Sequence, residues 1–118
     1  MKIAMGQTYP VLGKIDINLR VMLDQMEEYS KKGVELIIFP ELSLTGYLLQ
    51  GQLYNVAISS DSPEMIEICR ASKELNISVM FGFVEEWKGG KIYNSAAFIK
   101  EGSIRMIQRK LLYVIPVL

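Results

Sequence analysis

Apolar positions recur along the chain with two different periods, which predict helices and strands in turn. Two segments carry apolar residues at helical spacing, and the other apolar runs are short and rich in Val, Ile and Phe, as strands are. The order β-α-β-α-β-β-β predicts an α/β fold, in which helical crossovers build a parallel sheet and hairpins extend it. Helices are expected at 17–32 and 63–76, and strands at 2–7, 34–39, 77–87, 91–100 and 104–110.

Capping residues place the helix boundaries. Asp16 is a candidate N-cap of the first helix and Gly33 its C-terminal stop. Asp61 or Ser62 is expected to cap the second helix, with Pro63 at its first position.

Two segments fit no clean period. Residues 47–60 are interpreted as a loop with a short helix, and residues 111–118, "LLYVIPVL", are almost wholly apolar. Because a domain usually ends in polar residues, the last segment suggests a truncated chain. Residues 1–118 are therefore expected to form the N-terminal part of one domain.

Composition and charge exclude several kinds of partner. Lys plus Arg and Asp plus Glu both total 13, and there is no basic run, so no nucleic acid partner is expected. A net charge of zero removes an electrostatic obstacle to self-association, and we expect a homo-oligomer.

No apolar run approaches the roughly 20 residues of a membrane-spanning helix. The single Cys fits a reducing compartment, so a soluble, cytoplasmic protein is expected.

The chain has few groups for cofactor chemistry. It contains no His and no acidic cluster, so neither a metal nor an organic cofactor is expected. "GQTYPVLGK" is not a phosphate loop, because six residues rather than four separate Gly6 from Gly13. Cys69 lies in mid-helix on the face expected to pack on the sheet, where a thiol behaves as a small hydrophobic group.

Glu41 is the first candidate for catalysis. It follows the apolar strand in "VELIIFPELSLTGY", at the carboxyl end of a strand, where sites of α/β sheets gather. Pro40 keeps Phe39 extended, so Glu41 stands on a rigid stem. A half-buried carboxylate there would suit a general base. The alternative is a solvated loop carboxylate that caps a backbone N–H.

Lys110 is the second candidate, at the end of the last strand in "QRK". The alternative is a surface lysine, which strand ends often carry. If the strands before Glu41 and Lys110 point the same way, the two side chains can face each other. A lysine–carboxylate pair over a crevice can activate a nucleophile and stabilise a developing oxyanion.

Several motifs in order resemble the carbon–nitrogen hydrolases of the nitrilase superfamily. They are "KIAMGQTYPVLGKIDINLRVM", "GVELIIFPELSLTGY", "FGFVEEWKGGKIYNSAAFIKEG" and "IQRK". The resemblance implies part of an α-β-β-α sandwich, with a mixed sheet flanked by helices, and a Glu-Lys-Cys triad. It assigns the general base to Glu41 and the oxyanion-stabilising cation to Lys110. The family's nucleophilic Cys lies downstream of the Lys, and Cys69 does not match it.

Two functions remain open. The chain is either the N-terminal portion of an amide- or nitrile-cleaving hydrolase, inactive alone, or a non-catalytic remnant that acts as an oligomerising or ligand-binding domain. For the hydrolase, the resemblance implies a small-molecule substrate, and nitrile, aliphatic amide, carbamoyl and glutamine substrates all stay possible. "LTGYLLQGQLYN" loosely resembles a segment of the glutamine-hydrolysing domains of NAD synthetases.

Overall fold

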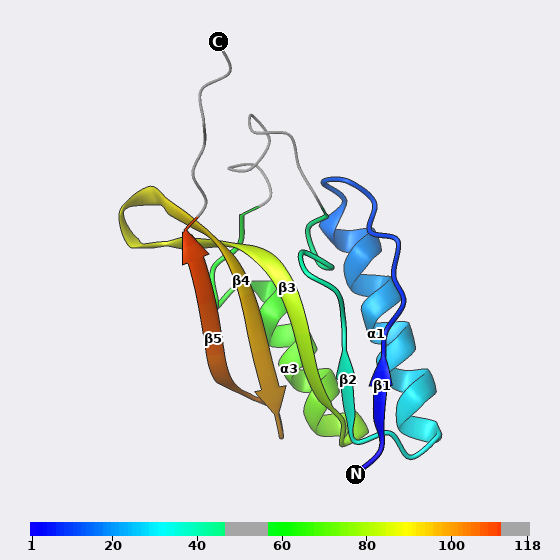
Figure 1. Cartoon of the computed structure of the whole chain (residues 1–118). Helices are drawn as coiled ribbons and strands as arrows, with labels where there is room; N and C mark the ends of the chain where they lie inside the picture. The colour runs from blue at the N-terminus through cyan, green and yellow to red at the C-terminus, as the bar shows by residue number, and fades with distance from the viewer. Residues whose placement is uncertain (47–56, 112–118) are drawn as a thin grey trace.

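The structure is a computed structural model that describes residues 1–46 and 57–111, and these form one sheet with two helices against it (Figure 1). The elements follow the predicted order. They are β1 (Ile3–Met5), α1 (Ile15–Lys31), β2 (Leu36–Ile38), α3 (Pro63–Leu75), β3 (Ser78–Trp87), the short 3₁₀ turn η2 (Lys88–Gly90), β4 (Lys91–Lys100) and β5 (Ser103–Leu111).

The five strands lie in the order β1-β2-β3-β4-β5. The first three are parallel, and β4 and β5 each run antiparallel to the strand before them. Each parallel connection contains a helix, as parallel strands require. The prediction of an α/β fold with a mixed sheet flanked by helices is therefore confirmed.

Both helices pack on the same face of the sheet and enclose the core (Figure 1). Side chains alternate between the faces of a strand, so every second residue of β3 and β4 points toward the helices. The buried residues of this core include Leu19, Met22 and Met26 of α1, Met65 and Ile68 of α3, and Ile37, Val79, Phe81, Phe83, Ala97 and Ile99 of the sheet. The helices thus direct the remaining side chains of the sheet to the opposite face.

That opposite face, here called the open face, carries an apolar row that crosses all five strands. The register aligns Met5 with Ile38, Ile38 with Met80, Met80 with Phe98 and Phe98 with Met106. Met5 and Met106, at the two ends of the row, are 67% and 54% exposed. Neither of the two described helices covers this row, because both pack on the other side.

Helix boundaries agree with the capping signals at two of the three ends for which a signal was identified. Ser62 accepts a hydrogen bond from the Met65 backbone N–H at 3.3 Å, and Pro63 opens α3 as predicted. Gly33 follows α1 with a φ of +78°, the left-handed conformation of a C-terminal stop. The Asp16 cap is wrong, because α1 begins at Ile15 and its N-cap, Lys14, makes no side-chain hydrogen bond. Asp16 instead lies in the first turn, where its charge favours the helix dipole.

The strands also differ in length from the prediction. β1 and β2 have three residues each, shorter than the expected 2–7 and 34–39. The loop expected at 47–60 falls mostly on residues 47–56, and the apolar segment on 112–118, both outside the described residues.

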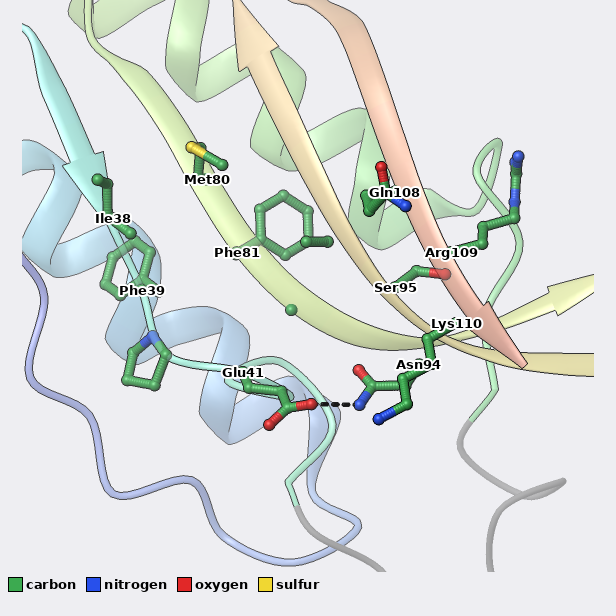
Figure 2. Close-up of a pocket in the computed structure, with 13 residues that line it drawn as sticks. Ile38, Phe39, Glu41, Met80, Phe81, Asn94, Ser95, Gln108, Arg109 and Lys110 are labelled. Atoms are coloured by element: carbon green, nitrogen blue, oxygen red, sulfur yellow. Dashed lines mark hydrogen bonds between the residues drawn. The ribbon is translucent and has the colours of Figure 1, made fainter. Parts of the chain in front are cut away.

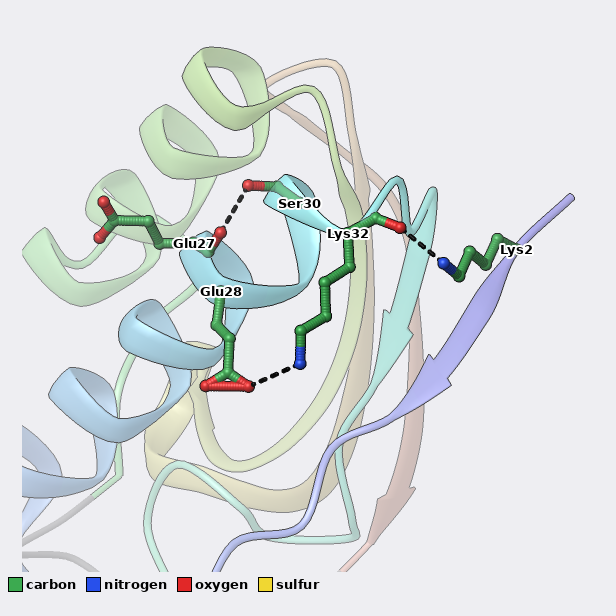
Figure 3. Close-up of polar contacts among 5 residues, drawn as sticks. All are labelled: Lys2, Glu27, Glu28, Ser30 and Lys32. Carbon is green, nitrogen blue, oxygen red and sulfur yellow. Dashed lines mark hydrogen bonds and ion pairs between the residues drawn. The ribbon is translucent and has the colours of Figure 1, made fainter.

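A hydrogen bond joins the C-terminal end of α1 to the residue that precedes β1 (Figure 3). Lys2 donates from Nζ to the carbonyl of Lys32 at 2.6 Å. The Ser30 hydroxyl donates to the carbonyl of Glu27 at 2.8 Å, and Lys32 Nζ donates to Glu28 Oε2 at 3.5 Å. Carbonyls at a helix end have no partner within the helix, and the Lys2 ammonium supplies one to the Lys32 carbonyl.

Of the two helices described, α1 has 17 residues and α3 has 13. Neither one is both long enough and apolar enough to cross a membrane.

Candidate functional site

The two candidate residues come from the ends of strands that run in the same direction. β3 is parallel to β2, and two antiparallel pairings then give β5 the direction of β2. Glu41, after β2, and Lys110, near the end of β5, therefore reach the same edge of the sheet. They line one hollow of about 320 Å³ on the open face (Figure 2). The two strands thus point the same way, which is the condition under which the two side chains can face each other.

The segment 40–46 continues β2 as an irregular edge that still bonds to β3. The Leu44 N–H donates to the Gly82 carbonyl at 3.0 Å. The hydroxyls of Ser43 and Thr45 accept from the N–H groups of Gly82 and Val84, at 3.4 and 3.3 Å. Side-chain oxygens thus replace the backbone carbonyls of a regular strand, and they hold the segment that carries Glu41.

Asn18 fixes the same segment from the helix side. Its side chain is 3% exposed, and its Nδ2 donates to the carbonyls of Val11 and Leu44, both at 3.0 Å. Its Oδ1 accepts from the Val11 N–H at 2.7 Å. A buried amide with all of these bonds made rigidifies its surroundings. The sequence indicated no role for Asn18, since an Asn within a helical period carries no local signal of such contacts.

Gly82 lets the Glu41 backbone approach β3 closely. A Cβ at this position would overlap the Leu42 nitrogen and lie 3.0 Å from the Glu41 Cα. Leu42 itself has a φ of +53°, in the left-handed region that branched residues rarely adopt. It is held there because its side chain packs on Val84 and Ile92. Strain of this kind, held by packing, is common at functional sites.

Glu41 is exposed, so it is not the half-buried carboxylate considered for a general base. Pro40 before it is exposed as well. The side chain is nevertheless oriented, because its Oε1 accepts a hydrogen bond from the Asn94 amide (Figure 2). Glu41 is thus a solvent-accessible carboxylate with a fixed direction.

Lys110 lies beside the same amide. The register places it directly opposite Asn94 across β4 and β5. Its side chain is exposed and extends toward Glu41 and Asn94 in Figure 2. Asn94 therefore stands between the two candidates, one reached by a hydrogen bond and the other by strand pairing. Asn94 belongs to the resembling stretch "FGFVEEWKGGKIYNSAAFIKEG", but the sequence alone indicated no role for it.

Behind Lys110, on the helix-covered face, the partly exposed Arg109 forms an ion pair with a buried carboxylate. Its Nε and Nη2 donate to Oε1 and Oε2 of Glu85, at 2.6 and 3.0 Å. Glu85 is fully buried and also accepts from the Ser95 hydroxyl at 2.8 Å. The guanidinium lies 4.1 Å from the centre of the Trp87 ring. The hydrogen bond to Glu85 raises the pKa of Arg109, which stays charged.

Cys69 lies away from the hollow. It is on α3, half-buried against the core of the helix-covered face, and burial raises the pKa of its thiol. It is the single cysteine of the sequence. Within residues 1–46 and 57–111, no group of three or more Cys, Asp or Glu side chains is arranged to hold a metal ion.

Comparison with known proteins identifies the family. The family model described as carbon-nitrogen hydrolase matches residues 2–116, nearly the whole chain. The chain belongs to the carbon–nitrogen hydrolase family. The resemblance noted in the sequence is thereby confirmed.

Among curated members of this hydrolase family, the glutamine-dependent NAD(+) synthetase of Acinetobacter baylyi is 36% identical over 109 residues. The match covers 92% of this chain and 20% of that protein. The formamidase of Pseudomonas syringae is 36% identical over 89 residues, which are 75% of this chain and 26% of the formamidase. This hydrolase chain thus spans about a fifth to a quarter of the length of these relatives.

A solved structure supports the same fold. The glutamine-dependent NAD+ synthetase of Acinetobacter baumannii, solved with adenosine diphosphate, superposes with a TM-score of 0.72 at 34% identity. The superposition covers 92% of this chain and 20% of the synthetase. The sheet and helices described above are therefore an arrangement that a carbon–nitrogen hydrolase relative also adopts.

Proposed function

We propose that this chain supplies the general base, Glu41, and the oxyanion-binding cation, Lys110, of a hydrolase that cleaves amide C–N bonds. The observation that supports it is the convergence of both side chains on one hollow, from the ends of two strands that run in the same direction. Asn94 lies between them and orients the carboxylate. The nucleophilic thiol comes from outside these 118 residues, because Cys69 lies on the helix-covered face.

The two groups suit the steps of thiol-based amide hydrolysis. Glu41 takes the thiol proton while the sulfur forms a bond to the amide carbon. The ammonium of Lys110 stabilises the oxyanion that results. As the C–N bond breaks, Glu41 returns the proton to the leaving nitrogen, and a thioester remains. Water, deprotonated by Glu41, then cleaves the thioester and regenerates the thiol. The exposed position of Glu41 gives it access to that water.

The substrate class is a primary amide, and we propose the side-chain amide of glutamine as the first member to test. Two relatives reported above are glutamine-dependent NAD+ synthetases, and a third is a formamidase. A hollow of about 320 Å³ is at the lower end of the sizes found for small-molecule sites, and fits a compact substrate.

The test is a chimera in which this chain replaces the matching stretch of the Acinetobacter baylyi synthetase. We expect the chimera to form NAD+ from glutamine. Glu41→Gln and Lys110→Met should each lower kcat by about 10²–10⁴-fold, the range for loss of a general base or of an oxyanion partner.

Cys69→Ser is the matched control, because it changes the only thiol of the inserted segment without touching the hollow. The chimera carrying it should retain full activity. The 118-residue chain alone should release no ammonia from glutamine. A folded chimera that is inactive, or one that is indifferent to Glu41→Gln, would contradict the proposal.

A second function, self-association of the chain, is favoured by the apolar row on the open face. Met5, Ile38, Met80, Phe98 and Met106 form a continuous stripe across the sheet, with exposed ends. Apolar patches that extend this far on a small protein are usually interaction surfaces. We propose that a second copy of the chain covers this row when the 118 residues are studied alone. A charge placed in the row should then reduce the mass of the assembly in solution.

A further inference from the structure

We propose that Arg109, through its buried pair with Glu85, is a positioning residue that holds Lys110 at the hollow. The proposal rests on the proposed function for the role of Lys110, but it is argued from contacts on the opposite face of the sheet. Arg109 does not approach Glu41 or Asn94, and it points away from them in Figure 2. Its effect on the site would come through the backbone of β5.

β5 needs such an anchor near its end. It is the last strand of the described sheet, with β4 as its one neighbour there. Lys110 is the next-to-last residue of β5. Ends of edge strands open readily, because few backbone bonds hold them. A lysine on an opening strand end would not keep a fixed place relative to Glu41.

Arg109 supplies the anchor by reaching across two strands. Its guanidinium bonds to Glu85 of β3 in two places, at 2.6 and 3.0 Å, and so passes over β4. Ser95, its direct partner on β4, donates to the same carboxylate at 2.8 Å. Three strands thus meet at one buried carboxylate. The ring of Trp87 stacks on the guanidinium at 4.1 Å and restricts its movement.

The neighbouring arginine of the same strand makes no comparable contact. Arg105 lies 3.5 Å from Glu101, and both side chains are exposed, at 46% and 68%. Exposed pairs of this kind contribute little to stability. Glu85 by contrast has no exposed surface and Arg109 is 32% exposed, so separation of this pair would leave a buried charge without its partner. Arg105 therefore serves as a matched control for Arg109.

The alternation of side chains connects the anchor to the site. Consecutive residues of a strand point to opposite faces, so a guanidinium fixed on the helix-covered face fixes the direction of Lys110 on the open face. Because a slip of one residue would exchange the two faces, the pair between Arg109 and Glu85 also fixes the register that sets Lys110 opposite Asn94.

A zero-length cross-link between Glu41 and Lys110 tests the proposal on the 118-residue chain. A water-soluble carbodiimide joins a carboxylate and an amine in contact as an amide, with loss of water, and mass spectrometry quantifies the linked peptides. The exposed pair Glu27–Lys31 of α1, 3.5 Å apart, provides an internal reference in the same molecule. The measured quantity is the yield of the first link divided by that of the second.

We expect Arg109→Gln to lower this ratio about tenfold or more, because the strand end then loses its buried partner. Arg105→Gln should leave it unchanged. Arg109→Lys keeps the positive charge but cannot make the bidentate hydrogen bond to Glu85, so it should give an intermediate ratio. The reference link corrects for the efficiency of the reagent, and circular dichroism of each variant shows that the chain compared is folded, so that a lower ratio reports loss of positioning.

An unchanged ratio in folded Arg109→Gln would overturn the proposal. If circular dichroism shows that Arg109→Gln does not fold, Arg109→Lys decides: a ratio equal to that of the parent overturns the proposal, and a reduced one supports it. A parent chain that yields the reference link but no Glu41–Lys110 link would contradict the proposed function itself, and this proposal with it.

Discussion

Asn94 faces Lys110 across strands β4 and β5, and the same side chain donates a hydrogen bond to Glu41. One amide therefore relates the proposed base to the proposed cation. Asn94 is partly buried, whereas Glu41 and Lys110 are both exposed. The most restricted of the three side chains thus directs the carboxylate, and its own place is set by the strand pairing.

Asn94→Ala should lower kcat of the glutamine-dependent chimera about 10- to 100-fold. A hydrogen bond to a charged group contributes about 1.5–3 kcal/mol, and each 1.36 kcal/mol corresponds to tenfold in rate. KM should change little, because the amide orients the base rather than the substrate. Gln108→Ala is the control, since Gln108 also lines the hollow from β5. Equal losses in the two variants would argue against an orienting role for Asn94.

Gly82→Ala should displace Glu41 and destabilise the fold by about 2–3 kcal/mol, as overpacking does. A Cβ there overlaps backbone atoms of Leu42, which cannot rotate away as a side-chain end could. Urea unfolding gives the stability, and the side-chain amide resonances of Asn94 report the displacement of Glu41.

Gly89→Ala separates this effect from the ordinary cost of replacing a glycine. A Cβ at Gly89 meets nothing within 4 Å, and the φ of +77° alone opposes the substitution. We expect a loss of about 1 kcal/mol and unshifted Asn94 resonances. If Gly82→Ala also left those resonances in place, close approach at Gly82 would not be what positions Glu41.

The sequence was sufficient for the order of the elements, which follows from apolar periodicity. The common edge of Glu41 and Lys110 stayed conditional on the direction of their strands, which the pairing in the structure supplies. The sequence did not predict that Asn94 lies opposite Lys110, because this pairing depends on one irregularity in the register of β4 and β5. Simple pairing from the turn, where Lys100 meets Ser103, would set Asn94 opposite Arg109. A bulge near Phe98 inserts one residue in β5 and brings Lys110 to that place.

The local sequence also gave no sign of the burial of Glu85 or of the exposure of Glu41. The burial of Glu85 depends on a partner 24 residues away, and a Glu in "VEEW" gives no sign of it. The exposure of Glu41 depends on the turn at Leu42, whose positive φ is unusual for a leucine. Local pattern carries no information on either contact.

Arg109→Ala should destabilise the chain by about 3–5 kcal/mol, since it leaves the buried carboxylate of Glu85 without its partner. The double variant Glu85→Leu with Arg109→Met should recover much of that loss, because no charge then remains buried. Glu101→Ala, which removes the exposed partner of Arg105, should cost about 0.5 kcal/mol or less. Urea midpoints of the four proteins provide the comparison. Equal losses at Arg109 and Glu101 would contradict the distinction between the two pairs.

Cys69 should react slowly with iodoacetamide near neutral pH. Burial raises the pKa of its thiol, so the reactive thiolate forms at higher pH than in a small thiol such as N-acetylcysteine. The sign for stability follows from the same shift. Because the folded pKa is above the unfolded one, the contribution of the neutral thiol is complete below the unfolded pKa and is lost as pH rises through the folded pKa.

Cys69→Ala should therefore remove part of the alkaline loss of stability. Thermal unfolding of parent and variant across the alkaline range measures this difference. Alkylation as fast as that of N-acetylcysteine, or identical alkaline profiles for the two proteins, would be inconsistent with a thiol packed against the core.

Met106→Lys should reduce self-association of the 118-residue chain without unfolding it. Met106 ends the apolar row of the open face and is 54% exposed, so a lysine there meets water in the monomer and an apolar surface in an assembly. Ile66 is equally exposed, at 53%, but it belongs to α3, which packs on the opposite face. Ile66→Lys thus changes surface hydrophobicity and charge by a similar amount away from the row. Light scattering at tens of micromolar, a range where interfaces of moderate strength are occupied, should show a smaller mass for Met106→Lys than for the parent and Ile66→Lys. A parent that is already monomeric, or two variants that dissociate alike, would exclude the open face as the surface through which copies associate.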